Sequence, residues 1–142
     1  MNSGSALKLG LFLQLMIASL LFNEIENRSI SAPAVVDAFV AKVSKVIDGD
    51  TIILSGLDNA IRLWGVDAPE MDEEGFRAAK DALSSAVSNG DILCHQVDTD
   101  HYNRIVARCY SISEKFEINR YLIQAGVAEE YRYFTNGFYE ND

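Results

Sequence analysis

Residues 38–66 read AFVAKVSKVIDGDTIILSGLDNAIRLWGV and contain the clearest strand pattern of the chain. Apolar residues alternate with polar ones over Ala38–Val46, which is typical of a strand, and Asp48-Gly49 then turns the chain into the apolar run Thr51–Leu54. A second turn at residues 55–59 leads to a third apolar stretch, Ile61–Val66. Three strands joined by tight turns predict a meander.

The second half of the chain alternates helical and strand patterns. A helix of about thirteen residues with a stop signal at Asn89-Gly90 is predicted from the helical spacing of Phe76, Ala79, Leu83 and Ala86. Residues 92–97 and 104–112 form a predicted hairpin, and 116–125 a second helix. This order predicts a mainly β, α+β fold, a five-stranded OB-fold barrel with two or three helices. No element is predicted for residues 131–142.

The N-terminal residues differ from the rest. Lys8 is the only charge before the apolar run Leu9–Phe22, which is short for a membrane span and fits the core of a secretory signal. We expect residues 1–34 to be a signal peptide or an uncleaved membrane anchor, and residues 35–142 to be one domain. The protein is then exported, and secreted or periplasmic. We expect it to be monomeric.

The two cysteines, Cys94 and Cys109, lie symmetrically about the polar turn of the predicted hairpin. Directly opposed residues on paired strands are close enough for a disulfide, and an exported protein meets an oxidising compartment. The alternative is two small buried thiols, and a one-residue slip in register would put the side chains on opposite faces.

The chain is acidic, with a formal net charge of −9 at pH 7. Without residues 1–34, which hold two basic and two acidic side chains, 10 Lys and Arg remain against 19 Asp and Glu. Such a domain lacks the broad basic surface that holds a polyanion, so binding of nucleic acid would depend on a local cation site and well-placed arginines.

Two carboxylates stand at predicted strand ends. Asp48-Gly49-Asp50 alone is weak evidence, because many hairpin turns contain Asp-Gly. Asp50 begins the second strand and Asp67 leaves the third, so both carboxylates are expected at one rim of the meander. Together with a backbone carbonyl they suit Ca²⁺, whereas the two cysteines and two histidines do not form a zinc pattern.

Two arginines and one further carboxylate complete the candidate site. Either Arg62 or Arg104 alone would be an ordinary surface residue, but a pair of guanidiniums can stabilise the charge on a phosphodiester. Glu70, held just after Pro69, can accept a proton from an attacking water or orient it. The alternative is that Glu70 is a solvated loop acid, which is how we interpret its neighbours Asp72, Glu73 and Glu74.

These residues fall in the motifs IDGDT (47–51), IRLWGVDAPE (61–70) and D-x-Y-x-R (100–104), followed by AGVA (125–128). In this order they resemble the staphylococcal nuclease (thermonuclease) family over about residues 38–134. The resemblance implies an OB-fold barrel and a Ca²⁺-dependent endonuclease that cleaves DNA and RNA and leaves 3′-phosphates.

The resemblance also implies residue roles. The Ca²⁺ ligands would be Asp50, Asp67 and the backbone carbonyl of Ala68. The catalytic residues would be Arg62, Glu70 and Arg104, with Tyr102 near the substrate phosphate. Two positions depart from the family pattern. Asn103 replaces the usual glycine, but asparagine tolerates a left-handed backbone. Ala68 stands where the family often has a residue with a hydroxyl group.

Two other functions stay open at this point. The barrel could be a non-catalytic OB-fold module that binds single-stranded nucleic acid or an oligosaccharide, or an accessory protein of envelope or polysaccharide assembly. Binding without metal-dependent cleavage would favour either one.

Overall fold

The computed structural model describes Gln14 and residues 30–140. The chain divides into two units, Met1–Ser31 and Ala32–Asp142, and the fold described here is that of the second. The expected signal or anchor lies outside the described residues, apart from Gln14 and residues 30–34. Within the described part, no helix is both long and apolar enough to cross a membrane.

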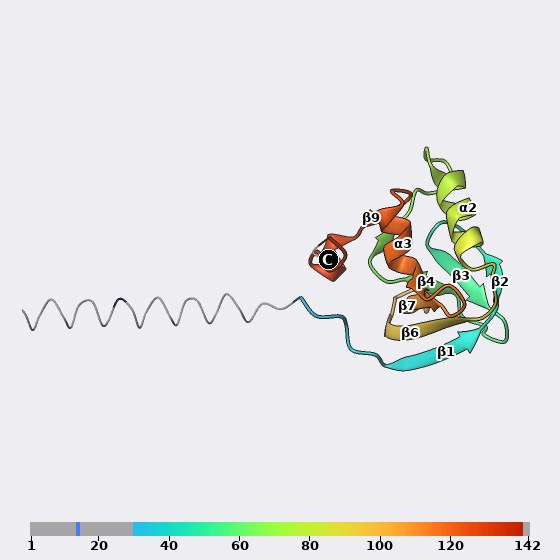
Figure 1. The fold of residues 1–142 in the computed structure, drawn as a ribbon, viewed down its shortest axis with the longest axis horizontal. Coiled ribbons are helices and arrows are strands. Elements are labelled where there is room, and N and C mark those ends of the chain that lie inside the picture. Colours follow the sequence, from blue (N-terminus) through green and yellow to red (C-terminus); the bar gives the residue numbers. More distant parts are fainter. Residues whose placement is uncertain (1–13, 15–29, 141–142) are drawn as a thin grey trace, which may run out of the picture. The chain divides into compact units, whose positions relative to one another are not determined.

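Within residues 30–140, most strands belong to one sheet (Figure 1). They are β1 (Asp37–Ala41), β2 (Val43–Val46), β3 (Thr51–Leu54), β4 (Ile61–Leu63), β6 (Ile92–Thr99), β7 (Ile105–Ser111) and β8 (Phe116–Glu117). The strand order is β1-β6-β7-β4-β3-β2, with β8 paired to β7. Only Lys42 separates the two end strands, β1 and β2, in the chain. The sheet therefore curls until its ends meet, which confirms the predicted OB-like α+β fold.

Two predicted strands are each divided in two. The first breaks at Lys42, so that β1 pairs with β6 and β2 with β3. The third ends at Leu63, because Gly65 has φ 70° and turns the chain into β5 (Val66–Asp67), which pairs with β9 (Glu129–Glu130). The alternation of apolar residues does not reveal these breaks, because it continues across both.

Three helices lie within residues 30–140: α2 (Phe76–Ala86), α3 (Ile118–Gln124) and α4 (Arg132–Thr135). The first predicted helix is real but ends at Ala86, before Asn89-Gly90. The second begins two residues later than predicted, because residues 116–117 form β8. The helices α2 and α3 pack against each other beside the sheet (Figure 1).

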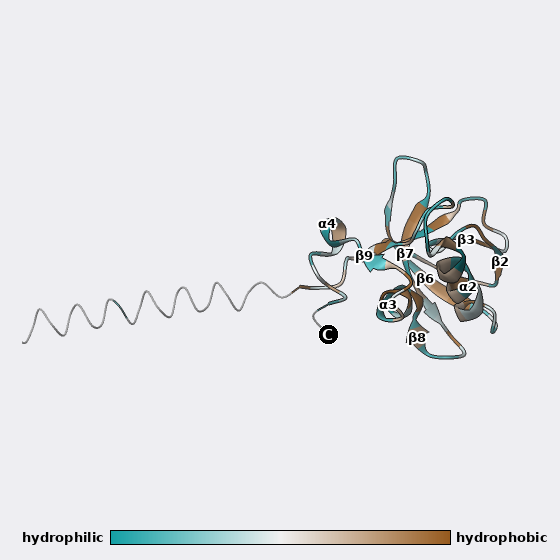
Figure 2. Cartoon of the chain, turned by 90° about the horizontal axis from the view of Figure 1, so that it is seen from above, coloured by the Kyte–Doolittle hydropathy of each residue, from teal (hydrophilic) through white to brown (hydrophobic). Residues whose placement is uncertain are grey.

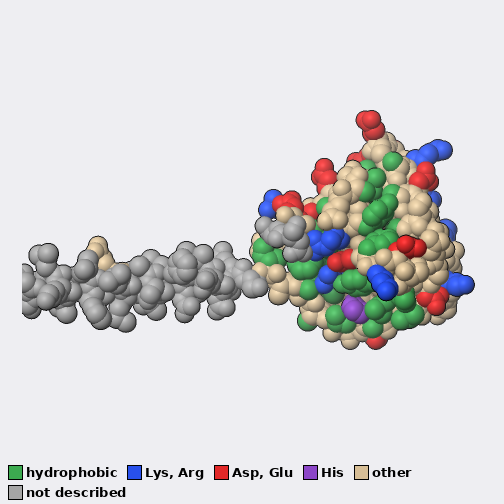
Figure 3. Space-filling model, in the orientation of Figure 1, with side chains coloured by type: hydrophobic (Ala, Val, Ile, Leu, Met, Phe, Trp, Pro, Cys, Tyr) green, Lys and Arg blue, Asp and Glu red, His purple; other side chains and the backbone are tan. Residues whose placement is uncertain are grey.

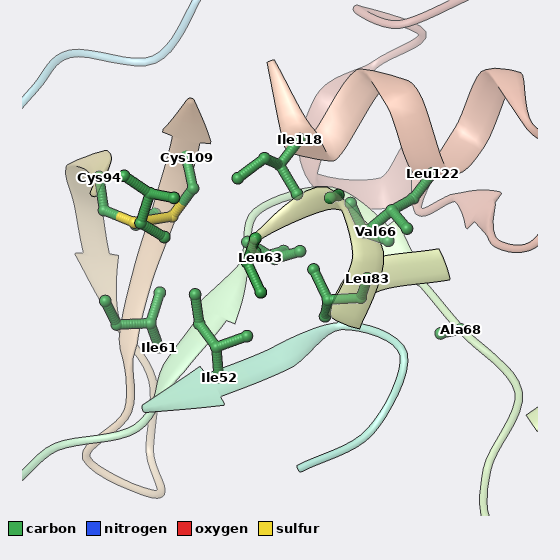
Figure 4. Close-up of a cluster of buried hydrophobic side chains, with 14 of the residues drawn as sticks. Ile52, Ile61, Leu63, Val66, Ala68, Leu83, Cys94, Cys109, Ile118 and Leu122 are labelled. Carbon is green, nitrogen blue, oxygen red and sulfur yellow. A yellow bond between two sulfur atoms is a disulfide. The ribbon is translucent and has the colours of Figure 1, made fainter. Parts of the chain in front are cut away.

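The core lies between the sheet and these two helices. Leu83 of α2 and Leu122 of α3 are fully buried with Ile52, Ile61 and Leu63 of the sheet (Figure 4). In Figure 2 the hydrophobic residues follow the strands, whereas β9, made of two glutamates, is hydrophilic. Burial of these aliphatic side chains is the main stabilising contribution to the barrel.

Cys94 and Cys109 face each other across β6 and β7 and are joined by a disulfide (Figure 4). Both residues are completely buried in the same core. The bond closes a loop with a sequence separation of 15 that contains the turn between the two strands.

The C-terminal residues 131–140 pack on the Trp64-Gly65 turn. The Tyr131 N–H donates to the Gly65 carbonyl over 2.8 Å, and the Trp64 ring contacts those of Phe138 and Tyr139. A methyl group at Gly65 would overlap the side chain of Thr135 in α4, so this position accepts only glycine without rearrangement.

Candidate active site

Arg62 stands at the centre of the candidate site. It lies on β4, between the buried residues Ile61 and Leu63, and its side chain is 19% exposed. Its Nη1 is 3.1 Å from Asp50 Oδ2, and its Nη2 is 3.9 Å from Asp67 Oδ1. Nη1 also donates to the Val66 carbonyl over 2.6 Å. The two strand-end carboxylates thus lie on either side of one guanidinium.

Asp50 is a buried carboxylate, 6% exposed, immediately before β3. Its Oδ2 accepts the Ala68 N–H over 2.9 Å, and its Oδ1 accepts the Thr51 hydroxyl over 3.0 Å. Burial raises its pKa to about 6, although Arg62 and the Ala68 N–H act in the opposite direction. The positive charge around Asp50 therefore does not fully offset its loss of hydration.

Arg104 is held by Asp100, four residues earlier. The Arg104 Nε is 2.7 Å from Asp100 Oδ2, and the Arg104 N–H donates to Asp100 Oδ1 over 2.9 Å. Desolvation acts to raise the pKa of Asp100, but the hydrogen bonds from Arg104 and Tyr102 lower it on balance. Asn103 has φ 62°, so it adopts the left-handed conformation expected of the turn.

Both arginines line one cavity of about 440 Å³. Its other walls come from the Trp64-Gly65 turn, the end of β6, and the C-terminal residues Tyr131 and Phe134. A cavity with two guanidiniums and aromatic walls can hold a phosphate with an attached ring.

Tyr102 does not line this cavity. It is 70% exposed, with its ring centroid 5.4 Å from the Arg104 guanidinium carbon. Its neighbour His101 lines the cavity instead.

A second hollow, of about 470 Å³, adjoins the first through Asp67, whose Oδ1 is 3.9 Å from Arg62 Nη2. Asp67, Ala68, Pro69, Glu70 and Glu73 form one wall, and residues 126–129 form the other. Glu70 is exposed, and its N–H donates to Glu73 Oε2 over 2.8 Å. Glu73, which we interpreted as a solvated acid, therefore stabilises the turn that carries Glu70.

The candidate metal ligands are all oxygen atoms. Asp67, with a side chain 59% exposed, is open to solvent, whereas Asp50 is enclosed. Among residues 30–140 and Gln14, no group of three or more His, Cys, Asp or Glu side chains is arranged to hold a metal ion. Any cation here would thus depend on two carboxylates, backbone carbonyl groups and water.

Three parts of the site were not predicted from the sequence. Asp100 was visible in the D-x-Y-x-R motif, four residues before Arg104, but received no role. His101 lies in the same motif. Tyr131 and Phe134 gave no signal, because residues 131–142 have no periodicity and reach the cavity only through tertiary packing.

The family model described as "Staphylococcal nuclease homologue" matches residues 60–142. A protein of Escherichia coli named "Uncharacterized endonuclease" is 30% identical over 96 residues, which cover 66% of this chain and 62% of that protein. The "Micrococcal nuclease" of Shigella flexneri is 27% identical over 114 residues, 74% of this chain and 65% of that protein. The chain thus spans just under two thirds of the length of these relatives.

Proposed function

The chain belongs to the staphylococcal nuclease homologue family, and from this premise we propose that it is a nuclease. In this proposal it is a thermonuclease-type endonuclease that hydrolyses phosphodiester bonds of DNA and RNA with Ca²⁺ and leaves 3′-phosphates. The observation that carries the proposal is the cavity that Arg62 and Arg104 share.

The two arginines suit a phosphodiester for a physical reason. Charge gathers on the equatorial oxygens of the phosphorus as water attacks, and fixed guanidiniums stabilise this charge more than they stabilise the ground state. Asp50 and Asp100 hold Arg62 and Arg104 in place through contacts of 3.1 and 2.7 Å. Pre-positioned donors need little rearrangement during the reaction.

The residues around Asp50 fit a hard divalent cation. Because burial raises the pKa of Asp50 despite the nearby arginine, additional positive charge at its carboxylate would be favourable. Oxygen ligands in an irregular shell are the set that Ca²⁺ accepts. Asp50, Asp67 and the Ala68 carbonyl would hold the ion, which would supply Lewis-acid polarisation of the phosphate.

Glu70 is the proposed base for the attacking water. It lines the hollow that contains Asp67, and Asp67 Oδ1 is 3.9 Å from Arg62 Nη2 in the arginine cavity. The Glu70–Glu73 hydrogen bond holds its backbone and leaves its carboxylate in the exposed part of the turn.

The acidic surface agrees with binding through a local site. On the face shown in Figure 3, basic side chains are interspersed with acidic ones and form no continuous basic surface. Affinity for DNA or RNA would then come from few phosphate contacts, so we expect weak substrate binding that falls with salt. The export of a monomer, either released or anchored through residues 1–34, is part of the same proposal.

Conservative replacement of the arginines tests this function. We expect Arg62→Lys and Arg104→Lys each to lower cleavage of single-stranded DNA by about 10²-fold or more, because lysine lacks the planar fork of donors. Arg77→Lys is the matched control, since Arg77 is exposed on α2. If the Arg62 and Arg104 variants turn over like wild type, the proposed clamp is wrong. DNA binding without cleavage by wild type would favour a non-catalytic module.

A further inference from the structure

The proposed nuclease mechanism needs a proton for the oxygen that leaves. We propose that His101 supplies it, as the general acid that protonates the departing 5′-oxygen of the substrate. This inference rests on the proposed phosphodiesterase activity and adds a catalytic residue to it.

The chemistry of the cavity singles out this side chain. Among the described residues that line the arginine cavity, the titratable ones are Arg62, Arg104, Asp98, Asp100, His101 and Tyr131. Arginine stays protonated in proteins and is a poor proton donor, and a tyrosine phenol gives up its proton only at high pH. Carboxyl groups are ordinarily ionised at neutral pH, and Arg104 lowers the pKa of Asp100 further. Imidazole is the group that can hold and release a proton near neutral pH.

The placement of the two hollows fits an in-line reaction. Glu70 lines one hollow, and His101 lines the other, which contains both arginines. The pair of Arg62 and Asp67 joins the two, because Arg62 lines one and Asp67 the other. In an in-line displacement, the attacking and leaving oxygens lie on opposite sides of the phosphorus. In the proposed arrangement, a phosphate bound by Arg62 receives water from the adjoining hollow of Glu70 and releases its alcohol into the cavity of His101.

The His101 side chain is also positioned by its neighbours in the turn and open to solvent. Its ring lies against that of Tyr102, with centroids 3.9 Å apart, in the turn that Asp100 organises through the Tyr102 and Arg104 N–H groups. It remains exposed to solvent, so it can regain a proton between turnovers. The charged groups of the cavity around it are the carboxylates of Asp98 and Asp100 and the guanidiniums of the two arginines.

The proposed step balances in atoms and charge. Water adds to the phosphorus and passes one proton to Glu70, while the bond from phosphorus to the 5′-oxygen breaks and its electron pair stays on that oxygen. Protonated His101 gives its proton to this oxygen, which forms the 5′-hydroxyl. Glu70 then loses a proton to solvent and His101 takes one up.

A substrate with a better leaving group tests this role. In DNA with a single bridging sulfur in place of the 5′-oxygen, the leaving thiolate needs no proton, because a thiol is far more acidic than an alcohol. The experiment compares His101→Gln with wild type, both as the full chain with Ca²⁺, on ordinary and sulfur-bridged DNA. His95→Gln is the matched control, because His95 packs against Tyr110 and lies outside the cavity.

We expect His101→Gln to cleave ordinary DNA about 10²-fold or more slowly than wild type. On the sulfur-bridged strand, we expect its cleavage rate to lie within about threefold of the wild-type rate. His95→Gln is expected to match wild type on both strands. Equal losses of His101→Gln on both strands would assign His101 to binding or folding and overturn the proposal, as would no loss on either. Wild-type protein that cleaves neither strand would refute the proposed nuclease itself.

Discussion

Replacing Asp50 by asparagine removes a carboxylate whose burial opposes folding at neutral pH. The pKa of Asp50 rises from 3.8 to about 6 in the folded protein, chiefly through desolvation. The folded state therefore binds more protons than the unfolded state between these two pH values. Stability contributed by the protonated form is fully present below about pH 4 and is lost as the pH rises through 6.

The size of the change in unfolding free energy follows from the change in the pKa of Asp50. A difference of about two pKa units corresponds to about 3 kcal/mol, and Asp50 is too buried for solvent to screen most of it. Wild-type protein in chelator should thus lose about 3 kcal/mol of unfolding free energy through this group between pH 4 and pH 7. The hydrogen-bonded Asp100, whose pKa is lowered, contributes its pH dependence below this window.

Urea denaturation at several pH values measures this difference. The quantity to compare is the slope of the unfolding free energy with pH, because Asp50→Asn also removes the carboxylate charge 3.1 Å from Arg62 and so changes stability at every pH. Between pH 4 and pH 7, we expect the unfolding free energy of wild type to fall by about 3 kcal/mol more than that of Asp50→Asn. Asp58→Asn, at an exposed turn position, should keep the wild-type slope. Parallel profiles for wild type and Asp50→Asn would show that burial of Asp50 does not cause this pH dependence.

Three further perturbations test the fold around the site. Reduction of the disulfide, or its removal by Cys94→Ala with Cys109→Ala, should lower the free energy of unfolding by about 3 kcal/mol in urea titrations, and an unchanged midpoint would contradict this. Tyr139→Phe should cost about 2 kcal/mol, because the buried Tyr139 hydroxyl donates to Glu117 over 2.7 Å; a cost near zero in the same titration would show that the bond adds nothing. Gly65→Ala should cost at least about 1–2 kcal/mol, because φ is positive there and the methyl group would meet α4; a wild-type melting temperature would disprove the strain.

The parts of the fold that depend on local pattern were predictable from the sequence. Alternation identified the strands, and the helical spacing of Ala79, Leu83 and Ala86 identified the buried face of α2. The left-handed turn at Asn103 follows from side-chain chemistry that acts within a few residues.

The parts that depend on distant contacts were not predictable. Residues 131–140 meet the Trp64-Gly65 turn only in the folded chain, so no local periodicity reports their packing. The same holds for Arg62, which taken alone was interpreted as an ordinary surface residue, whereas the folded chain places it between Asp50 and Asp67. Sequence motifs suggested which residues form the site, and the tertiary structure was needed to separate the Glu70 hollow from the arginine cavity.

Cleavage of single-stranded DNA and RNA by the full chain, with Ca²⁺ or with chelator, tests the proposed nuclease most directly when wild type is compared with Glu70→Gln. Glu74→Gln is the matched control, because Glu74 is an exposed acid in the same loop. We predict Ca²⁺-dependent cleavage by wild type and by Glu74→Gln, and a loss of about 10²-fold or more in Glu70→Gln. Intact DNA and RNA after incubation of folded wild-type protein with Ca²⁺ would show that the protein is not a nuclease of this type.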